Sequence, residues 1–107
     1  MKPKCYIAGK ITGDLNYQFK FDRAAEAYER QGYTVLLPTA LPVGLSNADY
    51  MRICFAMIDS ADVVVFLPDY VHSAGAQLEH HYCLYTDKVI VHLQELSGVV
   101  THFNDQL

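Results

Sequence analysis

Two short segments carry residues whose types and spacing suit an anionic ligand and chemistry on it. The first is the loop Gly9–Asp14, which reads Gly-Lys-Ile-Thr-Gly-Asp. Its glycines, Gly9 and Gly13, let the backbone approach a ligand closely, while Lys10 supplies a cation and Thr12 a hydroxyl. The spacing matches neither a P-loop nor a dinucleotide-binding glycine motif. Two interpretations therefore stand side by side, a ligand loop and a tight turn between a strand and a helix.

The second segment is Ser73–Glu79, the start of an expected helix. Ser73 is a suitable N-cap, and the amides that follow it point toward a position where anions are favoured. Gly75 and Ala76 precede Glu79 by one helical turn, and helical side chains lean toward the N-terminus. We therefore expect the Glu79 carboxylate to extend over two residues with almost no side chain, with room for a flat ligand. An ordinary surface glutamate is the alternative, although a glycine near a helix start costs up to ~1 kcal/mol.

The histidines and cysteines do not form a metal-binding pattern. His80 and His81 are adjacent on a helix and cannot face one ligand together. Cys5, Cys54 and Cys83 are widely spaced and lack the spacing of metal ligands. We expect no metal, and we interpret the cysteines as buried thiols in a reducing compartment, which favours a cytoplasmic location.

Apolar runs alternate with helical periods along the whole chain, and these patterns give the expected elements. The apolar runs predict strands over 5–8, 33–37, 62–67 and 88–93. The periodic stretches predict helices over 16–31, after a cap at Ser46, and over 74–85, and the tail 94–107 is expected to hold one more short helix.

Strands separated by helices imply right-handed parallel crossovers. The prediction is a three-layer α/β sandwich with a four- or five-stranded parallel sheet, Rossmann-like or flavodoxin-like, in one domain over 1–107. In such sheets the ligand binds beyond the carboxyl ends of the strands. The loops 9–14, 38–45 and 68–73 lie at that edge, and the first strand presents Tyr6 near it.

The composition and charge of the chain indicate which kinds of partner to expect. The chain has 107 residues, 51% hydrophobic and 19% charged, which is the balance of one ordered domain. Its net charge is −4 and it has no basic run, so a nucleic acid is not an expected partner. No apolar stretch approaches the roughly 20 residues of a membrane span, and we expect no membrane association.

Taken together, these segments resemble the nucleoside 2-deoxyribosyltransferase superfamily, over about Cys5 to Leu93. The run Tyr6–Gly13 looks like its first strand and loop, and Asp-Val-Val-Val from Asp62 followed by Ser73-x-Gly-x-x-x-Glu looks like its second signature. A small phage and bacterial branch is the most similar, because Tyr-Met-Arg from Tyr50 and Ser-x-Gly-Ala-x-x-Glu-His recur there.

The resemblance implies a function and a set of roles. Glu79 stands at the position of the nucleophile that attacks the anomeric carbon of a (deoxy)nucleoside and forms a glycosyl-enzyme ester. A second nucleobase or water then resolves the ester, as in a transferase or an N-glycosidase. Ser73 stands where members that act on 5′-monophosphates carry serine. The loop with Gly9, Lys10, Thr12 and Gly13 would then bind phosphate together with Gly75 and Ala76, Tyr6 would hold Glu79, and no cofactor is required.

One position departs from that family's pattern. Characterised members carry an aspartate eight residues before the strand-opening acid, and Cys54 occupies that position here. An alternative therefore stays open, in which the chain is a non-catalytic nucleotide-binding or sensing module. The size of the chain and tyrosines such as Tyr82 and Tyr85 also favour a homodimer or larger homo-oligomer.

Overall fold

The computed structural model describes residues 1–94 and the backbone of 102–104. The elements follow one another as β1 (Lys4–Ala8), α1 (Tyr17–Arg30), β2 (Thr34–Leu36), the 3-10 turn η1 (Pro38–Ala40), α2 (Asn47–Ser60), β3 (Val63–Phe66), the 3-10 turn η2 (Pro68–His72), α3 (Ala74–Tyr85), β4 (Val89–Leu93) and β5 (His102–Asn104). The four predicted strands are confirmed, and each of their ends lies within one residue of the prediction.

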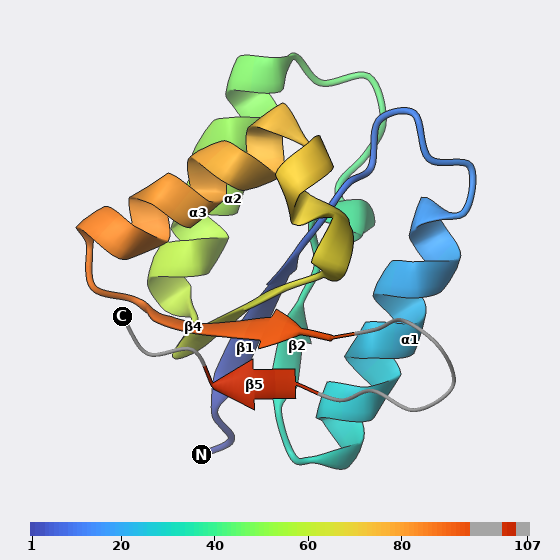
Figure 1. Ribbon diagram of the computed structural model, residues 1–107. Coiled ribbons are helices and arrows are strands. Elements are labelled where there is room, and N and C mark those ends of the chain that lie inside the picture. Colours follow the sequence, from blue (N-terminus) through green and yellow to red (C-terminus); the bar gives the residue numbers. More distant parts are fainter. Residues whose placement is uncertain (95–101, 105–107) are drawn as a thin grey trace.

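The strands form one sheet in the order β2-β1-β3-β4-β5 (Figure 1). The first four are parallel, as predicted, and the register places Ala8 of β1 beside Phe66 of β3. β5 runs antiparallel to β4, so the fifth strand does not extend the parallel set. The connection 94–101 is too short for a parallel crossover, which needs roughly a dozen residues or more. The prediction of a short helix in the tail 94–107 is wrong for residues 102–104, which form β5. The other residues of that tail after Gln94 lie outside the described residues.

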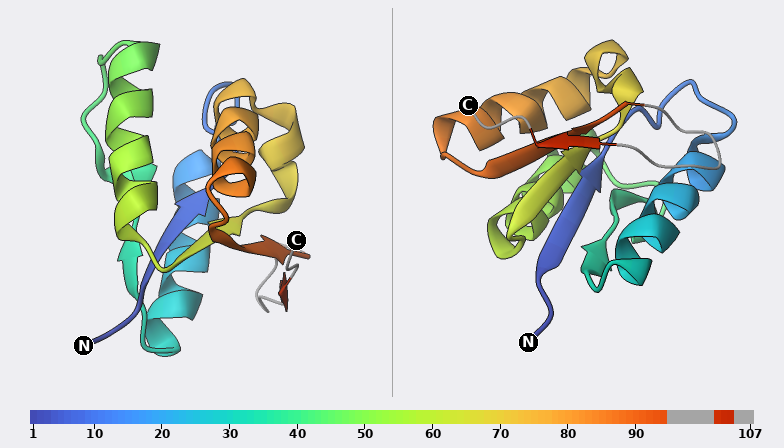
Figure 2. Two further views of the ribbon diagram at one scale, coloured as in Figure 1. Left: turned by 90° about the vertical axis from the view of Figure 1, so that its left-hand side faces the viewer. Right: turned by 60° about the horizontal axis from the view of Figure 1, so that its bottom comes forward.

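Helices cover both faces of the sheet, which gives the predicted three layers (Figures 1 and 2). Alternation along each strand separates the two cores. Odd-numbered β1 residues such as Ile7 pack with Phe21 and Tyr28 of α1. Even-numbered residues such as Tyr6 face the opposite layer, where they pack with Ile58 of α2 and Cys83 of α3. Tyr6 is thereby directed toward the helix that carries Glu79.

Burial on both faces explains the apolar run of β3. All four of its residues are buried, as expected for a central parallel strand covered by helices on both sides. The thiols of Cys5, Cys54 and Cys83 are free and buried, as predicted. Within the described residues, no helix is long and apolar enough to cross a membrane.

Serine caps fix the starts of the two helices on the second face. Ser46 Oγ accepts a hydrogen bond from the Asp49 amide at 3.1 Å, and Ser73 Oγ accepts one from the Ala76 amide at 3.1 Å. Both caps were predicted from the sequence, and each satisfies one of the amides that a helix leaves without an internal partner. The cap at Ser73 fixes the residue at which α3 begins.

Candidate functional site

A buried carboxyl group lies where β1, α2 and α3 meet. Glu79 of α3 is only 6% exposed, so the interpretation as an ordinary surface glutamate is wrong. The Tyr6 hydroxyl donates a hydrogen bond to Glu79 Oε2 at 2.9 Å, although the two residues are 73 positions apart in the chain. The Cys54 side chain of α2 lies close enough to both Glu79 and Tyr6 to affect their pKa values. Three elements thus converge on one carboxyl group.

Burial dominates the electrostatics of this cluster. It raises the pKa of Glu79 to about 7, and the hydrogen bond from Tyr6 and the nearby Cys54 side chain only partly oppose that rise. Burial also raises the pKa of Tyr6 well above its ordinary value and that of the Cys54 thiol to about 11, and the neighbouring Glu79 charge adds to both. At neutral pH the hydroxyl and the thiol therefore keep their protons, and the carboxyl group is divided between its two forms.

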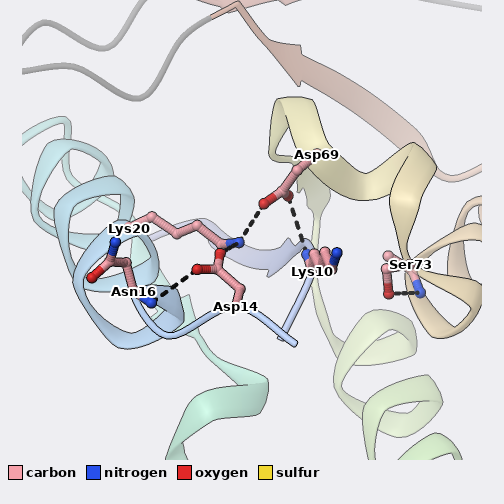
Figure 3. Close-up of polar contacts among 7 residues, drawn as sticks. Lys10, Asp14, Asn16, Lys20, Asp69 and Ser73 are labelled. Atoms are coloured by element: carbon pink, nitrogen blue, oxygen red, sulfur yellow. Dashed lines mark hydrogen bonds and ion pairs between the residues drawn. The ribbon is translucent and has the colours of Figure 1, made fainter. Parts of the chain in front are cut away.

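The loop Gly9–Asp14 is fastened to the loop after β3 by a lysine of α1. Lys20 Nζ forms ion pairs with Asp14 and Asp69, and its side chain is 8% exposed (Figure 3). The hydrogen bond from Lys20 is the main reason that the pKa of Asp14 is lowered. Asp69 Oδ1 also accepts a hydrogen bond from the Lys10 amide at 3.1 Å. Asp69 therefore joins two segments that follow neighbouring strands.

The glycines of this loop have separate structural reasons. A Cβ on Gly9 would lie 2.8 Å from Leu67 Cδ1 and 3.0 Å from its Cβ, so close packing at the end of β1 excludes a side chain. Gly13 has φ +83°, a backbone conformation that other residues rarely adopt. Both Gly13 and Thr12 are exposed, whereas Lys10 is half-buried. Close packing thus accounts for Gly9 and turn geometry for Gly13, while the exposed Thr12 and Gly13 leave the outer face of the loop accessible.

The space beside Gly75, at the start of α3, is less open than expected. A Cβ on Gly75 would lie 3.5 Å from Met51 Cε, which is an ordinary contact. The methionine methyl group therefore covers Gly75, and packing does not require glycine there. Ala76 is buried. The expected open floor beneath Glu79 is thus partly filled from α2.

The predicted site residues form two neighbouring groups. Tyr6 and Glu79 meet inside the second layer. The loop 9–14 lies beside η2, because Asp69 accepts a hydrogen bond from the Lys10 amide (Figure 3), and Ser73 follows η2 directly in the chain. The register of β1 with β3 produces this, because segments that follow paired strand ends must emerge side by side.

Comparison with protein families gives one match. Residues 3–92 correspond to the family described as "Domain of unknown function (DUF4406)". The chain belongs to the DUF4406 family. A comparison with curated proteins gave no match.

In this DUF4406 domain, the matched residues contain both groups of the candidate site, from Tyr6 through Ser73 to Glu79. The family description names no activity.

Sequence reasoning missed two residues of the DUF4406 domain that bear on this edge. Lys20 precedes Ala24 by four positions and so continues the apolar stripe of α1, which is an unusual place for a lysine. His92 lies directly beside Phe66 in the sheet register, on the buried face of β4. In both cases the sequence offered one sign, a charged or polar residue at a position where the helix or strand pattern calls for an apolar one.

Proposed function

We propose that this domain cleaves or transfers at the N-glycosidic bond of a (deoxy)nucleoside 5′-monophosphate, with Glu79 as nucleophile. The observation that carries the proposal is the hydrogen bond from Tyr6 to a nearly buried Glu79. A buried carboxyl group with a dedicated hydroxyl donor and a pKa near 7 is typical of functional sites rather than of surface helices.

The chemistry follows from the carboxylate. An ionised Glu79 oxygen attacks the anomeric carbon, the bond from that carbon to the base nitrogen breaks with the electron pair leaving on the nitrogen, and the base takes up a proton from solvent. Water or a second base then attacks the same carbon and releases the Glu79 carboxylate. The Tyr6 hydroxyl, which stays protonated, fixes the carboxylate orientation.

Two features of the sheet edge suit a phosphate group and so support the choice of a nucleotide as substrate. The helix start after Ser73 and the exposed outer face of the loop 9–14 lie at one edge, and helix N-termini favour anions. Ser73 already caps the Ala76 amide. We therefore assign phosphate contacts to the amides of Ala74 and Gly75, to Lys10 and to Thr12.

Release of free base from a panel of nucleoside 5′-monophosphates tests the proposal. The wild type is expected to release base, with a rate that rises with pH through about 7 because the carboxylate is the reactive form. Glu79→Gln keeps the shape and is expected to lose cleavage by orders of magnitude while still binding nucleotide. The exposed Glu26 offers a matched control, and Glu26→Gln should cleave like wild type. Equal rates in wild type and Glu79→Gln would exclude Glu79 as the nucleophile.

A second candidate function is nucleotide binding without turnover. Two observations favour binding without turnover. Glu79 is little exposed to a substrate, and the neighbouring Cys54 thiol, with its raised pKa, is a poor proton donor. If the domain only binds, nucleotides raise the melting temperature of both wild type and Glu79→Gln, and neither protein releases base.

We also propose a homodimer or larger homo-oligomer. Tyr82 contacts Asp59 within its own chain, with its hydroxyl donating to Asp59 Oδ1 at 2.7 Å. Tyr85 and Leu78 are exposed on α3, and they supply apolar area for a second copy. A monomer in light scattering at micromolar concentration would count against this assembly.

A further inference from the structure

A pair of histidines joins α3 to β4 at the carboxyl end of that strand. His80 Nε2 and His92 Nε2 lie 3.1 Å apart. The ring centroids are 5.2 Å apart, so the two rings approach through their Nε2 edges rather than face to face. The contact brings together residues that the sequence analysis did not connect.

Aromatic neighbours hold both imidazole rings in place. Phe66 of β3 packs edge-on against His80 with ring centroids 4.8 Å apart. Tyr70 of η2 stacks on His92 with ring centroids 5.5 Å apart and planes 18° apart, and it also lies 4.8 Å from the His80 ring. Both histidines are half-buried. The nitrogen pair is therefore preorganised by packing against two further elements, β3 and η2, rather than formed by two mobile surface side chains.

The nitrogen separation fits two ligands of one metal ion. Zinc–imidazole bonds are about 2.0–2.1 Å long. Two such bonds at an angle between about 90° and the tetrahedral angle place the nitrogens about 2.9–3.4 Å apart. The observed 3.1 Å lies within that range. Imidazole donors favour zinc, nickel and copper over magnesium and calcium.

We propose that His80 and His92 form a binding site for one divalent transition-metal ion of the zinc class. No group of three or more His, Cys, Asp or Glu residues suited to a metal occurs in the described part of the chain, so water or an added ligand completes the coordination. The sequence-based expectation of no metal rested on local spacing, since the adjacent His80 and His81 cannot share an ion and the cysteines lack the spacing of metal ligands. His92 was overlooked because it lies on a different element.

Metal binding requires the lone pairs of both Nε2 atoms. In the metal-free pair one ring donates its Nε2–H to the other, so on metal binding that ring carries its proton on Nδ1 instead.

Calorimetric titration of the full chain with zinc chloride tests the site. We expect one ion per chain in wild type, at least a tenfold loss of affinity in His80→Asn and His92→Asn, and unchanged affinity in His81→Asn. His81 is the matched control, because it is exposed and lies one position further along the same helix. No zinc binding by wild type, or equal affinity in all four proteins, overturns the proposal.

A second measurement does not depend on the variants folding. Cobalt bound to wild-type protein is expected to give visible absorption bands and, in X-ray absorption, scattering from two imidazole rings. Scattering from one imidazole or none overturns the proposal. The site is independent of nucleotide cleavage, since both experiments read metal binding alone.

Discussion

Replacing Glu79 by glutamine is expected to stabilise the folded protein at alkaline pH and to stabilise it much less in mild acid. Glutamine has nearly the same shape, and its amide oxygen accepts the hydrogen bond from Tyr6 that Glu79 accepts in the wild type. What the substitution removes is the requirement to bury a negative charge. The variant therefore measures how much stability the wild type loses by keeping an ionisable group at this position.

The sign and size follow from the pKa of the carboxyl group. Burial raises the pKa from 4.5 to about 7, so between these values the folded chain binds a proton that the unfolded chain has released. Wild-type stability accordingly falls as pH rises through this window and levels off above about 7. At about 1.4 kcal/mol for each pKa unit, the full loss is about 3 kcal/mol. Near pH 5 only about 1 kcal/mol of it has appeared.

Urea denaturation of wild type and Glu79→Gln at pH 5 and pH 8 measures the difference directly. The variant should gain about 3 kcal/mol at pH 8, which corresponds to on the order of 10 °C in melting temperature for a domain of this size. Glu26→Gln, at an exposed position of α1, should show no such pH-dependent gain. A stability difference that is the same at both pH values, or that favours wild type at pH 8, would refute the argument from burial.

Three other substitutions test the structural supports of the site. Gly9→Ala should destabilise the fold by about 1–3 kcal/mol, because the new Cβ would lie 2.8 Å from Leu67 Cδ1; an unchanged urea midpoint would contradict that packing. Lys20→Met should lower the melting temperature clearly more than Lys10→Met, because only Lys20 bridges two carboxylates; equal melting curves would count against the bridge. Ser73→Ala should cost about 1 kcal/mol in urea denaturation through the lost N-cap, and a neutral result would show that the cap contributes nothing.

Local patterns were sufficient to predict the elements. Each of these patterns depends on side chains only a few positions apart, so a single sequence is enough to recognise it. Examples are the apolar run of β3 and the helical stripe with Phe21 and Tyr28. The caps at Ser46 and Ser73 were equally local. The fifth strand was not, because antiparallel pairing of β5 with β4 depends on contacts between segments and not on a period.

The sequence by itself determined the parallel α/β order and the sheet edge at which the loops 9–14 and 68–73 emerge, and the family resemblance led to the expectation that Tyr6 holds Glu79, which the hydrogen bond between them confirms. Only the tertiary structure decided how deeply Glu79 is buried, that Cys54 and Met51 crowd its surroundings, and that Lys20 and the pair of His80 and His92 fasten neighbouring elements. The physical reason is that burial, and with it the pKa of a carboxyl group, is set by whatever packs around it from distant parts of the chain. The hydrophobic pattern of a helix or strand shows which of its faces is apolar, but it does not show which atoms of other helices and strands pack against that face.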